Sequence, residues 1–290
     1  MESLRKVYCN CMCQVRECFK DYRTICVLVI LAIFVDSYTR GTVAFAKSVD
    51  YSISPWLLPF LLCTRNVRVV IYAGFLLLLC NVSKKQSNAF YILVRSGHIS
   101  YHLGNLCYIM IASFCYSLFT MLIGIIMNAT SIRYEADWGK VLGTLSNPSQ
   151  SGIWLNTLRG DEKIIREFTV FQGMFACFVL LFLTGVFLGF LNYFLGILSE
   201  HAKLGIVVSG FFIMLDFVLQ TRTGLEKCIW FSPLSWSNLE KVRFKYVIQA
   251  PKLSYCFGML ILLNVGLVGL ILYKVVNIYY RKRVSLRSKK

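Results

Sequence analysis

The chain has 290 residues, of which 57% are hydrophobic, and its formal net charge is +17. A mean hydropathy of +0.62 excludes an ordinary soluble domain. Because the apolar residues fall in long runs separated by short polar segments, we predict an all-α, multi-pass membrane protein with a single transmembrane domain over residues 1–290.

Residues 1–23 are polar and basic before any apolar run begins, which predicts a cytoplasmic amphipathic helix and no cleavable signal peptide. Four cysteines are crowded into this segment: Cys9, Cys11, Cys13 and Cys18. Their alternating spacing suits a soft metal, and lipid attachment is a second alternative. No CxxC pair and no nearby histidine accompanies them, so we expect free thiols on a helix at the membrane surface and no bound metal.

Six membrane spans are predicted. The first covers residues 24–38, is short, is broken by Asp36, and can be extended as far as Ala46. The second covers residues 66–82, with residues 55–63 as a partly embedded entrance helix. The remaining spans are predicted at 103–127, 168–198, 204–220 and 255–280.

The charges of the connections predict the orientation of these spans. Six spans put both termini on the same side, and the basic residues gather in the N-terminal segment, in the connection after the second span, and in the tail over residues 281–290. The positive-inside rule places these segments in the cytoplasm, and the loops 128–167 and 221–254 outside. The charge of +17 needs no nucleic-acid partner, because contact with anionic membrane lipid accounts for it.

The charged residues Arg65, Arg68 and Asp216, in or near apolar runs, are singled out as candidates for function. The two arginines are costly in a lipid-facing helix, so we expect them at the outer interface or facing a protein interior. Asp216 is a candidate for a proton or cation path or for a helix contact, or it lies at the outer interface. Together these three residues are the candidate translocation path.

No motif for enzymatic chemistry is present. The chain lacks a GxxxxGK[ST] phosphate loop, an HExxH zinc motif and a GxSxG nucleophile motif, so we expect no catalytic residue and no cofactor. His98 and His102 share a helix face at a spacing that suits a metal, but they lack a third ligand, and we expect solvated histidines. Gly185 and Gly189 form a GxxxG pattern that favours close helix packing or dimerisation.

The connection at residues 84–104 is polar, has helical periodicity, and runs directly into the third span. It resembles the intracellular element of ABC-2-type permeases, in which an Arg-Ser-Gly-like stretch and a Gly-Asn or Gly-Lys pair lead into the third helix. The matching residues here are Arg95, Ser96, Gly97, Gly104 and Asn105. The segments PWLLPFLL and DWGKVLGTL also look like small permeases of Gram-positive bacteria, although the chain has no sizeable outer domain.

The resemblance implies a permease subunit that exports a drug, an antimicrobial peptide, a lipid or a glycan across the plasma membrane of a bacterium. It implies that residues 84–104 form a coupling element that docks onto a separate ATPase subunit, which binds the ATP. It also implies a second permease copy, identical or related. The docking residues would be Tyr91, Arg95, Ser96, Gly97, His98 and Tyr101.

Two other functions remain open from the sequence. A non-transporting membrane protein of the immunity or structural kind would have no ATPase partner and would tolerate substitutions at Arg95 and Gly97. A stand-alone channel or secondary transporter would use Arg65, Arg68 and Asp216 as pathway charges, and would be expected to hold more paired charges within its spans than the sequence reveals.

Overall fold

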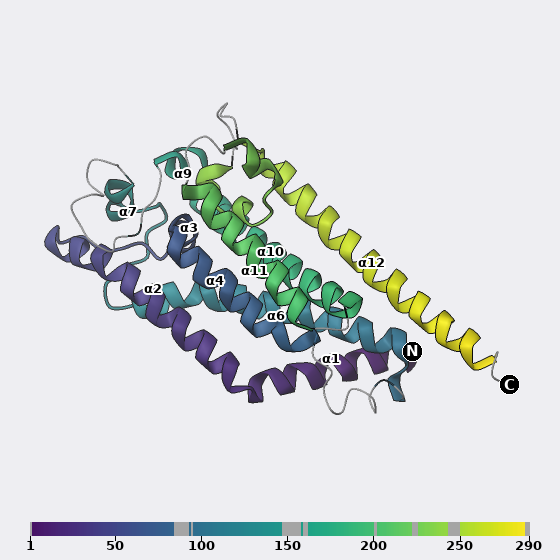
Figure 1. Ribbon diagram of the computed structural model, residues 1–290. Helices are drawn as coiled ribbons and strands as arrows, with labels where there is room; N and C mark the ends of the chain where they lie inside the picture. Colours follow the sequence, from purple (N-terminus) through teal and green to yellow (C-terminus); the bar gives the residue numbers. More distant parts are fainter. Residues whose placement is uncertain are drawn as a thin grey trace.

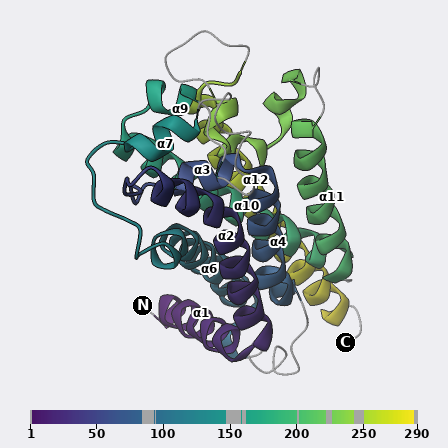
Figure 2. The same ribbon diagram turned by 90° about the vertical axis from the view of Figure 1, so that its left-hand side faces the viewer.

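The computed structural model describes residues 2–83, 93, 95–146, 158, 162–199, 202–221, 226–242 and 250–287, and these form a bundle of helices (Figures 1 and 2). Five helices are long and apolar enough to cross a membrane. They are α2 (Tyr22–Ser48), α6 (His98–Met127), α10 (Val170–Ser199), α11 (Ala202–Thr221) and α12 (Leu253–Arg287). No β-strand occurs in these described ranges, so the chain is an all-α, multi-pass membrane protein.

The amphipathic helix expected at residues 1–23 is α1 (Glu2–Lys20). It ends at Lys20 because Asp21 adopts an extended conformation and caps the next helix, where its Oδ1 accepts a hydrogen bond from the backbone N–H of Arg23 at 3.1 Å. α1 packs against α6 at the end of the bundle where both chain termini lie (Figure 1).

The first span takes the extended form that the sequence allows, as far as Ala46 and slightly beyond, and Asp36 does not interrupt it. α2 continues through this residue to Ser48. The carboxylate of Asp36 pairs with Arg40 one turn later, with Oδ2 and Nη2 2.6 Å apart. Because the pair neutralises the charge locally, the helix can pass Asp36 without interruption.

The second span is divided. The short helix α3 (Leu58–Cys63) forms the predicted entrance helix, and α4 (Arg65–Leu79) follows after a break at Thr64, whose backbone is extended. A 3-10 turn, η1 (Cys80–Ser83), follows α4 directly. At about 1.5 Å per residue, α4 alone is too short to cross a bilayer, which explains why it is not among the five long spans.

The remaining described segments gather at the two ends of the bundle (Figure 1). One end holds α7 (Lys140–Leu145), α9 (Glu162–Glu167) and the turns η2 (Glu226–Phe231), η3 (Ser235–Ser237) and η4 (Leu239–Lys241). The opposite end holds α1 and the two chain termini. The segments predicted to lie outside are therefore separated from those predicted to lie inside, and which end faces the cytoplasm stays a prediction.

Glycines bring the central helix α10 close to its neighbours. A Cβ atom at Gly185 would collide with the ring of Phe75 on α4, and one at Gly189 would collide with Ile109 on α6. The GxxxG pattern therefore serves helix packing within this chain, which was one of its two interpretations.

Candidate functional site: a buried arginine–aspartate pair

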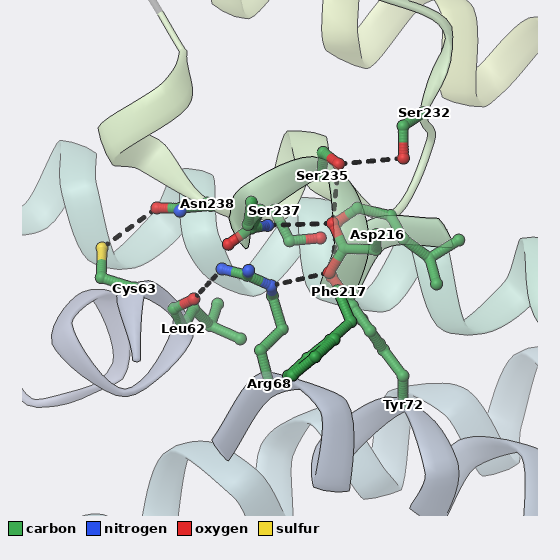
Figure 3. A network of polar contacts seen from close by, with 12 residues as sticks. Leu62, Cys63, Arg68, Tyr72, Asp216, Phe217, Ser232, Ser235, Ser237 and Asn238 are labelled. Carbon is green, nitrogen blue, oxygen red and sulfur yellow. Dashed lines mark hydrogen bonds and ion pairs between the residues drawn. The ribbon is translucent and has the colours of Figure 1, made fainter. Parts of the chain in front are cut away.

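Arg68 and Asp216 form an ion pair inside the helical bundle (Figure 3). Arg68 belongs to the first turn of α4, and Asp216 to the second half of α11, which packs against α4. The Arg68 Nε and Asp216 Oδ2 atoms are 3.2 Å apart, and both side chains have 0% of their surface exposed. Three other side-chain ion pairs, Arg40–Asp36, Arg166–Glu162 and Lys241–Glu240, are partly exposed.

Each member of the pair has further polar contacts. Arg68 Nη1 donates to the carbonyl oxygen of Leu62 at the end of α3. Asp216 Oδ1 accepts hydrogen bonds from Ser235 Oγ at 2.6 Å and from Gln220 Nε2 at 2.9 Å. Arg68 Nη2 is buried and has no hydrogen-bond partner among the described residues. The carboxylate thus has several hydrogen-bond partners, whereas both N–H donors of Arg68 Nη2 are unused among the described residues.

Ser235 belongs to a segment that we name the cap segment, residues 226–242. This segment is attached to the bundle by several bonds besides the one to Asp216. Tyr72 Oη donates to the carbonyl oxygen of Leu234 at 2.7 Å, and Cys63 Sγ donates to Asn238 Oδ1 at 3.2 Å. The ion pair therefore lies directly beneath the cap segment, as Figure 3 shows.

Arg65, one turn before Arg68, contacts the same helix in another way. Its guanidinium carbon lies 4.7 Å from the centre of the Phe217 ring, and its Nη1 donates to Thr221 Oγ1 at 3.0 Å. All three candidate path residues, Arg65, Arg68 and Asp216, therefore meet at the contact between α4 and α11. Of the two places expected for Arg68, the protein interior is correct. The side chain of Asp216 is completely buried within the protein. Its position at the outer membrane interface stays a prediction.

An ion pair that joins two helices and the cap segment suits a latch, because the three parts are held together while it is intact. Separating α11 from α4 would break the pair and leave two buried charges, so opening requires a source of energy. Intramembrane charges of this kind are functional candidates by default.

The predicted docking residues lie at the opposite end of the bundle, and Tyr91 falls outside the described residues. Arg95 is exposed and Ser96 is half-buried in a helical turn that Gly97 ends with a φ of +86°. His98 begins α6. Tyr101 is buried, and its carbonyl oxygen accepts a hydrogen bond from Asn10 Nδ2 of α1 at 2.8 Å.

The expectation of solvated histidines is wrong for His102. Its Nδ1 lies 2.6 Å from the hydroxyl oxygen of Tyr193 on α10, and the same oxygen accepts from Asn105 Nδ2 at 2.9 Å. Because Tyr193 already accepts from Asn105, its own proton is available to His102 Nδ1. This histidine therefore joins α6 to α10.

The N-terminal cysteines do not converge on one point. Cys9 and Cys13 are exposed on α1, whereas Cys11 is buried. Burial, together with the neighbouring Cys107, raises the pKa of the Cys11 thiol, which disfavours the thiolate that metals bind. Within the described ranges, no group of three or more potential ligands could hold a metal ion.

Comparison of the chain with protein-family models, with curated proteins and with solved structures gives no match.

Proposed function

We propose that this chain is the membrane-spanning permease subunit of an ABC-2-type transporter, driven by a separate ATPase subunit. The supporting observation is an exposed helical turn joined directly to a helix that crosses the bundle. Arg95 is exposed in this turn, and α6 begins three residues later at His98. α6 then packs against α1, α2, α4, α10 and α12. A force applied at Arg95 can therefore reach most of the bundle through one helix.

Gly97 makes this connection possible. Its φ of +86° is a conformation that side chains other than glycine rarely adopt, although a Cβ atom there would meet no neighbour. Glycine is therefore needed at this position for its backbone conformation and not to avoid a collision. Gly97 lies at the hinge between the turn and α6. A hinge next to an exposed turn suits the transmission of movement from a partner protein.

In the proposed mechanism, nucleotide-driven closure of two ATPase subunits pushes the turns that contain Arg95. The permease then shifts between inward-facing and outward-facing arrangements. At the other end, the Arg68–Asp216 latch opens when α11 moves away from α4, and the cap segment is released. Two permease copies take part, because six spans of one chain seldom enclose a route for a large cargo.

The proposed cargo is a drug, an antimicrobial peptide, a lipid or a glycan, and the proposed direction is export from a bacterial cell. The chain itself performs no chemistry in this scheme, because ATP is bound and hydrolysed by the partner subunit.

The first test is an affinity pull-down of the tagged chain from its native membranes in a mild detergent, with mass spectrometry of the co-purifying proteins. The proposal expects a P-loop ATPase in near-equal amount. Reproducible recovery of this chain alone would contradict it.

The second test is the substitution Arg95→Ala, with Arg133→Ala as the matched control. Both arginines are exposed, and Arg133 lies at the end of the bundle that holds the cap segment. The Arg95 variant should reach the membrane at the normal level but lose export and ATPase recovery. The control should retain both. Normal export by the Arg95 variant would count against the docking role.

A stand-alone channel or secondary transporter is the second candidate, and the buried Arg68–Asp216 pair is the observation that favours it. The purified chain in liposomes distinguishes the two functions. Movement of an ion or cargo without any ATPase, abolished by Asp216→Asn, would support this candidate. A non-transporting immunity or structural protein would move nothing and would tolerate changes at Arg95.

A further inference from the structure

The helix α1 exposes an apolar stripe. Leu4, Tyr8, Met12 and Phe19 recur at the spacing of one helix face, and their exposed fractions lie between 46% and 74%. Four large apolar side chains on a single face of a 19-residue helix are unusual on a water-exposed surface. This face has no partner within the described part of the chain.

The side of α1 that faces the protein is partly polar. Asn10 and Gln14 are buried, and Asn10 Nδ2 donates to the carbonyl oxygen of Tyr101. Asn10 lies so close to Gly104 that a Cβ atom there would collide with its amide group. The helix is therefore fixed to α6 through polar groups and a close approach, and its apolar side is directed away from this contact.

Basic residues flank the apolar stripe. Arg5 and Lys20 each follow an exposed apolar residue by one position, after Leu4 and Phe19 respectively, and Arg16 lies on the same side of the helix. One position is a rotation of about 100°, so these charges lie along the edge of the stripe. All three are exposed.

The position of α1 limits what this surface can meet. The helix is separated from the first membrane span, α2, by Asp21 alone. It lies at the end of the bundle that holds the chain termini (Figures 1 and 2). A helix so close to a span is held at the level of the membrane surface, where acyl chains lie next to charged headgroups.

We propose that α1 is a binding surface for anionic phospholipids of the adjacent membrane leaflet. The apolar stripe inserts between the acyl chains, and Arg5, Arg16 and Lys20 contact the negative headgroups. This inference does not depend on the proposed transport function. The hydrogen bond from Asn10 to Tyr101 attaches α1 to the start of α6. Binding of lipid to α1 would therefore also hold the start of α6 at the membrane surface.

Hydrogen–deuterium exchange of the full chain in nanodiscs tests the proposal. The backbone amides of α1 should exchange more slowly in discs of phosphatidylcholine with phosphatidylglycerol than in discs of phosphatidylcholine alone. Each basic residue should contribute about fivefold to this protection. Higher salt should weaken it, because salt screens surface charge.

The decisive variant is Arg5→Gln, Arg16→Gln and Lys20→Gln together, which should lose the dependence on anionic lipid. Its control, Arg133→Gln with Lys140→Gln, removes exposed charges at the other end of the bundle and should keep that dependence. Unchanged exchange in α2 and α12 shows that each variant is folded. A second variant, Leu4→Ser with Phe19→Ser, should lose protection in both kinds of disc.

Equal exchange of α1 in the two kinds of disc would overturn the proposal. So would protection that appears only when a soluble protein partner is added, since this would assign the surface to a protein and not to lipid.

Discussion

Arg68 and Asp216 are 148 residues apart in the sequence, yet their side chains form an ion pair with no exposure to solvent. The pair joins α4 to α11, and Ser235 of the cap segment donates to the same carboxylate. Removing either charge leaves the other one buried without its counter-ion, which is much more costly than the loss of an exposed pair.

The first prediction concerns the substitution Asp216→Ala. It should lower the free energy of unfolding by about 3–5 kcal/mol, because Arg68 remains buried and charged. The midpoint of thermal or denaturant unfolding in detergent measures this loss. The control Arg40→Ala removes the exposed partner of Asp36 and should cost at most about 1 kcal/mol.

A double variant separates the charge from the shape of the site. Arg68→Met with Asp216→Leu removes both charges and keeps apolar volume, so it should recover most of the stability lost in Asp216→Ala. If Asp216→Ala were no more harmful than Arg40→Ala, the pair would not be buried as described.

The second prediction concerns the attachment of the cap segment. Tyr72→Phe removes only the hydroxyl group that donates to the Leu234 carbonyl, which then keeps the longer bond from the Ser237 N–H at 3.5 Å. The expected loss of stability is about 0.5–1.5 kcal/mol. Tyr38→Phe is the matched control, because it removes the bond to Asn66 at an exposed site and should have little effect. Equal effects of the two substitutions would contradict the role of Tyr72.

The membrane spans could be predicted from the sequence because a bilayer imposes both length and hydropathy on a helix. The division of the second span could also be predicted, because the polar stretch that contains Arg65 and Arg68 separates two apolar pieces, and the structure places the break at Thr64. The sequence does contain a sign that the helix continues past Asp36, because Arg40 follows at the (i, i+4) spacing that allows an ion pair within one helix.

The candidate site could be predicted only in part. Charges within apolar runs point to Arg68 and Asp216, but a single sequence contains no sign that two residues in different helices are partners. Nothing in the sequence marks Ser235 and Tyr72 as part of the site, because a serine in a loop and a tyrosine in a span are common. Their importance arises from a contact that only the folded chain creates.

The third prediction concerns the cysteines of α1. In variants that keep one cysteine each, Cys9 should react with a maleimide much faster than Cys11 at neutral pH. Cys9 is exposed, whereas Cys11 is buried and its pKa is raised by that burial, so its reactive thiolate is scarce. Raising the pH should increase the rate at Cys11 until the thiol ionises. Mass spectrometry of the labelled chain gives both rates, and equal rates would mean that α1 does not pack on α6.

The fourth prediction uses the glycines to test the packing of α10. Gly185→Ala places a methyl group where the ring of Phe75 lies, so it should cost about 1–3 kcal/mol of stability. Gly266→Ala in α12 is the matched control, because a Cβ atom there meets no neighbour, and alanine should stabilise this helix by about 0.5–1 kcal/mol. The two substitutions add the same methyl group to a helical glycine, and only the surroundings differ. Opposite signs in the unfolding midpoint therefore report the contact between α10 and α4, whereas a stabilising Gly185→Ala would show that this contact does not form.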